Sequence, residues 1–74
     1  MTVRLHKVRA GWYETAAEPA VGVYVAYRAE AGHWEVARYV AAPDGGLELA
    51  LEFFGADTLS LVRDYITYLL EEAA

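Results

Sequence analysis

The chain has 74 residues, a formal net charge of −5 and an apolar share of 57%. This length supports one domain, expected to span residues 1–74. The absence of cysteine excludes disulfides, thiol catalysis and cysteine-held metal. No apolar run reaches the roughly 18 residues that a membrane helix needs. The N-terminus alternates charged and apolar residues, unlike a signal peptide. We therefore expect a cytoplasmic protein without a membrane partner.

The charges are unevenly placed along the chain. Arg4, Lys7 and Arg9 give the first nine residues a net charge of +3, whereas the remainder carries −8. An acidic chain is repelled by phosphate backbones, so a nucleic-acid partner is disfavoured. Only the basic strand with Arg4, Lys7 and Arg9 offers a nucleic-acid site, which we keep as the alternative function.

The first predicted strand runs from residue 3 to residue 15. Its apolar residues fall into two opposite phases of the two-residue period, so one sheet face cannot bury them all. We expect either a bulge near His6-Lys7 or Gly11, or two halves that face different ways.

The next two predicted strands, residues 21–29 and 33–42, form a hairpin through a two-residue turn at Ala31-Gly32. The predicted register sets Arg28 opposite Glu35, a favourable charge pair, and Tyr24 opposite Tyr39. It turns the alternate valines of the first of these strands towards the core. Tyr24 and Tyr39 then lie side by side on the open face.

The fourth predicted strand spans residues 47–54, where leucine and phenylalanine occupy every second position. A four-residue loop over residues 43–46 sets Val36 opposite Phe53 and places Arg38 between Val25 and Leu51. A loop one residue longer would pair Arg38 with Glu52 instead. We prefer the first register because it buries more apolar area.

A helix is predicted from Asp57, as N-cap, to Glu72. Its core stripe comprises Leu59, Val62, Ile66, Leu69 and Leu70. Three further apolar residues, Leu61, Tyr65 and Tyr68, widen the apolar side beyond what contact with one sheet requires. The predicted fold class is α+β, an antiparallel three- to four-stranded sheet with one C-terminal helix packed on one face.

The residues with catalytic chemistry form no convincing constellation. Ser60 has no histidine nearby in sequence, which argues against a serine triad. His33 and Glu35 share a strand face and could begin a metal site, but third and fourth ligands are not evident. Glu48 and Glu52 lie roughly 13 Å apart along their strand, too far for a retaining carboxylate pair. We expect a protein that is not an enzyme and has no catalytic, cofactor or metal site.

The order of elements resembles a known family. A strand with Gly11-Trp12-Tyr13, a hairpin with Trp34, and Phe53-Phe54 before Asp57-Thr58-Leu59 and a helix are similar to small AP2-like sheet-plus-helix domains. These include the arm-binding domains of phage integrases, and accessory proteins of actinobacterial phages have a similar layout. The resemblance covers residues 20–70. It implies the fold and a phage-type or accessory origin. The integrase-type sheet reads DNA through basic residues, whereas the corresponding face here is mainly tyrosine and glutamate.

The ten aromatic residues exceed what one sheet and one helix can shelter. The sequence therefore predicts a non-catalytic protein-interaction module that acts as a homodimer or binds another protein. A decoy that mimics DNA would be a special case of this function. The predicted interface residues are Tyr24, Tyr39, Phe54, Tyr65 and Tyr68, since tyrosines are enriched at interfaces.

Overall fold

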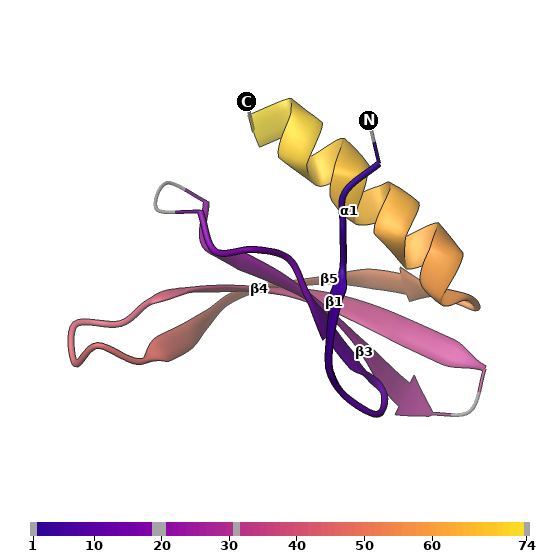
Figure 1. The fold of residues 1–74 in the computed structure, drawn as a ribbon, viewed down its shortest axis with the longest axis horizontal. Helices are drawn as coiled ribbons and strands as arrows, with labels where there is room; N and C mark the ends of the chain where they lie inside the picture. Colours follow the sequence, from indigo (N-terminus) through magenta and orange to yellow (C-terminus); the bar gives the residue numbers. More distant parts are fainter. Residues whose placement is uncertain (1, 19–20, 31, 74) are drawn as a thin grey trace.

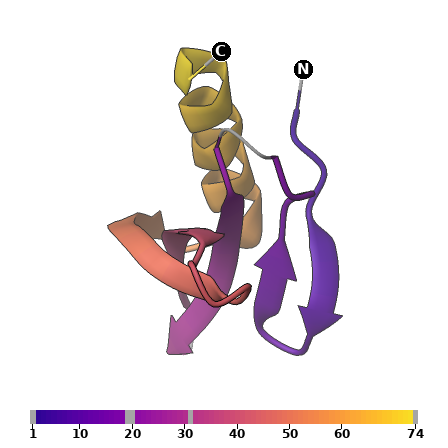
Figure 2. The same cartoon turned by 90° about the vertical axis from the view of Figure 1, so that its left-hand side faces the viewer.

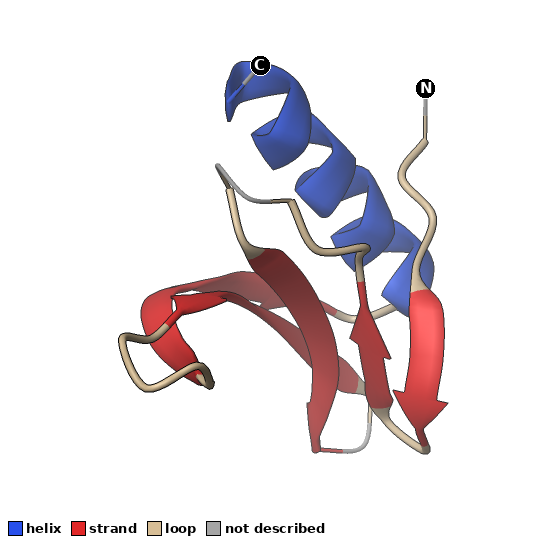
Figure 3. Cartoon of the chain, turned by 60° about the vertical axis from the view of Figure 1, so that its left-hand side comes forward, coloured by secondary structure: helices blue, strands red, loops and turns tan. Residues whose placement is uncertain are grey.

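The computed structural model describes residues 2–18, 21–30 and 32–73, without the side chains of Phe54 and Ala73. One antiparallel sheet of five strands in the order β1-β2-β3-β4-β5 carries a helix on one face (Figure 1, Figure 3). This confirms the predicted α+β class with one C-terminal helix, but the described sheet has five strands rather than the predicted three to four. The elements are β1 (His6–Arg9), β2 (Trp12–Glu14), β3 (Val23–Glu30), β4 (His33–Ala41), β5 (Leu47–Ala56) and α1 (Leu59–Ala73).

The single strand predicted over residues 3–15 is a hairpin of β1 and β2. The chain reverses at Ala10-Gly11, where Gly11 has a φ of 73°, a conformation that favours glycine. A bulge between Lys7 and Arg9 adds a second irregularity. The reversal explains why the apolar residues of this segment fall into two phases, because its two halves belong to different strands.

The predicted register of the β3–β4 hairpin is wrong by one residue. Glu30 lies opposite His33 as the two-residue turn requires, but a bulge at Ala29 shifts every later pair. Tyr24 therefore lies opposite Arg38, and Tyr39 lies opposite Val23. A slip of one residue exchanges the two faces of a strand.

Only β3 presents the opposite face to the predicted one, because Trp34 and Val36 of β4 and Phe53 of β5 pack on the helix side as predicted. The buried core under α1 comprises Tyr24, Ala26, Val36, Val62 and Ile66. The alternate valines Val23 and Val25, which were predicted to face the core, lie on the opposite face. Because these two valines are also buried, the sheet is apolar on both faces although only one has a helix.

The predicted β4–β5 register is confirmed over Val36, Ala37 and Arg38, with Arg38 opposite Leu51. A bulge at Ala50 then shifts the remaining pairs, so Leu49 lies opposite Tyr39. The side chain of Arg38 is satisfied at this position because its Nε donates a hydrogen bond to the carbonyl oxygen of Val21, at 2.6 Å.

The helix begins one residue later than predicted. Thr58, rather than Asp57, caps it, because the Leu61 N–H donates to the hydroxyl oxygen of Thr58 at 3.2 Å. The predicted core stripe is confirmed, with Val62 and Ile66 buried. On one flank, Thr67 accepts a hydrogen bond of 2.8 Å from the Val3 N–H and so fixes the segment before β1. Across the described residues, α1 and the rest of the fold provide no helix long and apolar enough to cross a membrane.

Candidate protein-interaction surface

The five predicted interface residues do not form one surface. The prediction of Tyr24 as an interface residue is wrong. Its side chain is only 5% exposed and lies in the core under α1, because the bulge at Ala29 turns it inwards. Tyr39 is half-buried on the face without the helix. Tyr65 is half-buried and Tyr68 is 56% exposed, both on α1. The side chain of Phe54 lies outside the described part of the chain.

The leucines of β5 are surface residues that the sequence pattern does not reveal. Leu47, Leu49 and Leu51 are 58%, 49% and 50% exposed. Their regular alternation in the sequence predicts a buried face. However, α1 follows β5 directly and turns back over the C-terminal end of β5. The hairpin of β4 and β5 projects beyond the helix at its other end (Figure 1). One helix cannot cover the whole length of this strand.

The exposed leucines face both sides of the sheet. Leu51 lies opposite Arg38 on the helix side, whereas Leu49 lies opposite Tyr39 on the other side, because the bulge at Ala50 reverses the alternation between them. A strand added to this edge would therefore meet leucine side chains on both of its faces.

The flank of α1 nearest β5 continues the apolar surface. The ring of Tyr65 packs edge-on against Phe53 of β5, with ring centroids 6.1 Å apart. Leu61 and Tyr68 lie one turn before and one turn after Tyr65 on the same flank, and they are 53% and 56% exposed. We call Leu47, Leu49, Leu51, Leu61, Tyr65 and Tyr68 the β5 surface.

A pocket of about 430 Å³ opens beside this surface, where β4, β5 and α1 meet. Its lining combines the side chains of Glu35 and Glu52 with the aromatic rings of Phe53 and Tyr65. His33 Nε2 lies 3.8 Å from Glu35 Oε1. Carboxylates beside aromatic rings attract a cationic side chain. In the part of the chain that the structure describes, no three histidine or acidic residues gather as metal ligands would.

The acidic groups extend onto the face without the helix. Tyr27 donates a hydrogen bond of 3.0 Å to Glu35. Burial, this hydrogen bond and the negative charges of Glu35 and Glu52 raise the pKa of Tyr27 from 10.0 to about 12. Burial is the first of these causes, and Glu35 of β4 contributes more than Glu52 of β5.

The basic residues proposed for nucleic acid are all exposed, but they are divided between faces. Lys7 pairs with Tyr13, which packs against the core, whereas Arg9 pairs with Trp12 on the opposite face. The guanidinium of Arg9 lies 4.3 Å from the centroid of the Trp12 ring. The bulge between Lys7 and Arg9 separates them, so Arg4, Lys7 and Arg9 do not make one continuous stripe.

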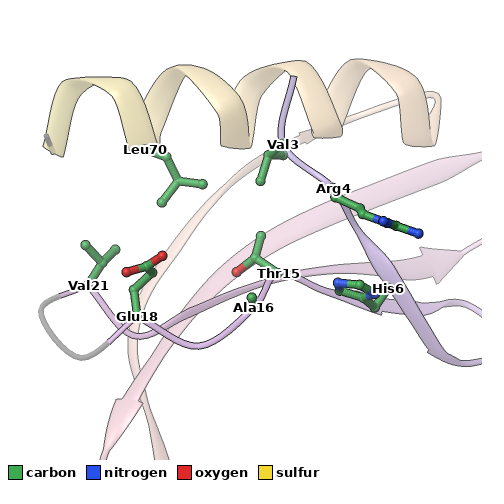
Figure 4. A pocket seen from close by; sticks show the side chains of 8 residues that line it. All are labelled: Val3, Arg4, His6, Thr15, Ala16, Glu18, Val21 and Leu70. Atoms are coloured by element: carbon green, nitrogen blue, oxygen red, sulfur yellow. The ribbon is translucent and has the colours of Figure 1, made fainter. Parts of the chain in front are cut away.

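A larger hollow of about 590 Å³ lies between the N-terminal segment, the connection from β2 to β3, and α1 (Figure 4). Arg4 and His6 lie at one end of it and Glu18 at the other. The hydroxyl of Thr15 accepts a hydrogen bond from the Tyr24 N–H at 3.0 Å. The polar side chains that line this hollow do not converge on one point. They therefore do not form a catalytic or ligand-binding arrangement.

Comparison of the chain with protein-family models, with curated proteins and with solved structures finds no match.

Proposed function

We propose that this chain is a non-catalytic protein-interaction module that binds its partner through the β5 surface. The observation that carries the proposal is the row of Leu47, Leu49 and Leu51 on a free sheet edge, each about half exposed. Single exposed apolar side chains are common on soluble proteins, but several large ones gathered along one free edge mark an interaction site. An edge strand also presents unpaired N–H and C=O groups that an added strand can use.

The leucines alone supply too little free energy for a stable complex. Covering a half-exposed leucine contributes about 1 kcal/mol, so the three contribute about 3 kcal/mol. Association costs at least about 4 kcal/mol in lost translational and rotational freedom. The partner must therefore also use the backbone of the β5 edge or the α1 flank with Leu61 and Tyr68. An interface over both elements meets this requirement.

Nucleic-acid binding through Arg4, Lys7 and Arg9 has weaker support. Arg9 is engaged with Trp12, whose indole N–H donates to Glu14 at 2.8 Å, so a carboxylate adjoins the basic strand. A phosphate backbone passing this strand would meet that carboxylate. The small size and the protein-binding surface instead fit an accessory role of the phage type that the resemblance implies.

The test compares the wild-type chain with the triple variant Leu47→Ser/Leu49→Ser/Leu51→Ser. Light scattering on the purified chains and on chains incubated with an extract of the source cell measures complex formation, and circular dichroism verifies the fold. We expect a species larger than one chain for the wild type and only the monomer for the triple variant. A wild type that stays monomeric in both settings, or a triple variant that associates equally well, would contradict the proposal.

A further inference from the structure

We infer that the partner of the β5 surface is strand β1 of a second copy of this chain, so that copies join head to tail along their sheet edges. The inference rests on the proposed function and names the partner of the same surface. It starts from the position of the two strands: β1 and β5 are the two outer strands of the sheet and lie on opposite sides of the molecule (Figure 2). In the described part of the chain they make no contact with each other.

The two edges carry opposite charges. Strand β1 contains Lys7 and Arg9, and both are exposed. Strand β5 contains Glu48 and Glu52, which are also exposed. Among the described residues, the one side-chain ion pair joins His33 and Glu35, so these four charges have no opposite partner within their own copy. Pairing β1 with β5 brings opposite charges together, which stabilises adjacent strands.

Apolar side chains are exposed on both edges as well. Val8 of β1 is 54% exposed and stands between Lys7 and Arg9. On β5, Glu48 and Glu52 stand at the two ends of the apolar stretch Leu49-Ala50-Leu51. The β1 edge therefore has an apolar side chain between two cations, and the β5 edge has apolar side chains between two carboxylates. The two edges are complementary in both respects. The pocket with Glu35, Glu52, Phe53 and Tyr65 lies at the same edge and fits the side chain of Lys7 from the neighbouring copy.

The alternative self-association, β5 against β5, opposes this charge pattern. A two-fold pairing centred on Ala50 joins two edges that each carry Glu48 and Glu52 and no basic residue, and the repulsion between these like charges is destabilising. Shifting the register places the bulge at Ala50 against regular strand, which sets residues of different faces opposite each other. The charges and the bulge therefore both favour β1 as the neighbour of β5.

Head-to-tail contact uses two different surfaces on each copy, so it continues until a ring closes or a filament forms. Because β1 has only four residues, each contact contains a short ladder. The association is therefore expected to be weak, to depend on concentration, and to decrease as salt screens the charges.

The first experiment exchanges the charges of each edge. One variant carries Lys7→Glu/Arg9→Glu and the other carries Glu48→Lys/Glu52→Lys, and sedimentation velocity at low salt measures association. The wild type is expected to form species larger than a dimer. Each variant alone has two edges of like charge and is expected to stay monomeric. An equimolar mixture of the two variants restores opposite charges at every contact and is expected to associate again.

The second experiment does not require charge reversal and exploits the absence of cysteine. Equal amounts of the Val8→Cys and Leu49→Cys variants are mixed and mildly oxidised, and mass spectrometry separates the three possible dimers. The mixed Val8→Cys–Leu49→Cys dimer is expected to exceed both homodimers at least about tenfold, because only β1 and β5 meet.

Each other outcome overturns the inference. A dominant Leu49→Cys homodimer, or a Lys7→Glu/Arg9→Glu variant that associates like the wild type, would show that β5 pairs with β5. A purified wild type that remains monomeric would exclude self-association altogether. If that monomer still captures another protein through the leucines of β5, the proposed function stands and only the second copy as partner is rejected.

Discussion

The two free edges of the sheet differ in length, charge and covering. Strand β1 has four residues with a bulge between Lys7 and Arg9, and a hydrogen bond from Val3 to the helix holds the segment before it. Strand β5 has ten residues, carries Glu48 and Glu52, and leaves three leucines about half exposed. A short, charged and bulged edge is a common defence against unwanted pairing, whereas a long apolar edge invites it.

This difference shows how one sheet can limit its own assembly. If both edges were long and apolar, any two edges would pair, and aggregation would follow. Here the apolar edge is acidic and its shorter counterpart is basic, so only unlike edges attract each other. This asymmetry depends on the geometry of β5, on the attachment of β1 and on the exposure of the leucines. Each can be altered separately.

The largest effect is expected for Gly55→Ala at the covered end of β5. A Cβ at this position would collide with the backbone carbonyl of Trp34, so β4 and β5 would have to separate. We expect the free energy of unfolding to fall by about 3 kcal/mol, measured by urea denaturation. A chain of this length has roughly 4–11 kcal/mol in total.

Gly46→Ala provides the matched control in the same hairpin. Its Cβ would meet only the side-chain oxygen of Asp44, at 3.3 Å, and the φ of Gly46 is not positive. We expect it to change the free energy of unfolding by less than about 1 kcal/mol. Equal effects of the two substitutions would show that β5 is not held as closely to β4 as the structure has it.

A smaller effect is expected for Thr67→Val, which removes the hydroxyl that accepts the Val3 N–H. The loss of this hydrogen bond should lower the free energy of unfolding by about 1 kcal/mol and raise hydrogen exchange at Val3. Thr67→Ser retains the hydroxyl and should behave like the wild type. Unchanged exchange at Val3 in Thr67→Val would show that other contacts fix the segment before β1.

Leu49→Ala should destabilise the isolated chain by less than about 1 kcal/mol, because half of this side chain is already exposed. The comparable truncation of the buried Ile66 should cost about 2–5 kcal/mol. Thermal denaturation at low concentration measures both. A cost for Leu49→Ala as large as that for Ile66→Ala would mean that the β5 edge is covered within the single chain.

The smallest structural disturbance is a titration of the acidic side of the sheet. The pKa of Tyr27 is raised to about 12, first by burial and then by Glu35. The unfolded chain releases this proton near pH 10, whereas the folded chain holds it to about pH 12, so stability falls as the pH rises through this window. Tyrosinate absorbance should show a late step that Tyr27→Phe removes. Its absence in the wild type would contradict the burial of Tyr27 and its hydrogen bond to Glu35.

The sequence predicted the elements far better than the faces. Hydrophobic periodicity located the helix and its stripe through Val62 and Ile66, and the turn at Ala31-Gly32 located a hairpin. The bulges at Ala29 and Ala50 could not be predicted, because alanine fits a regular strand and a bulge equally well. One bulge was enough to move Tyr24 from the predicted interface into the core.

The candidate site was only partly predictable for a related reason. The excess of apolar residues indicated an interface, and the flank with Leu61, Tyr65 and Tyr68 was recognised from helical spacing. The alternation of the β5 leucines predicts burial whether or not another element covers them. Their exposure depends on how far α1 extends over the sheet, which is a property of the tertiary structure.

Amide hydrogen exchange measured by NMR over a range of protein concentrations tests the pairing of the two edges most directly. The account predicts that exchange slows with rising concentration at amides of β1 and β5, while amides of β3 in the middle of the sheet keep their rates. Added salt should reverse the slowing at both edges. Exchange rates in β1 and β5 that do not change with concentration, or slowing at β5 alone, would contradict the account.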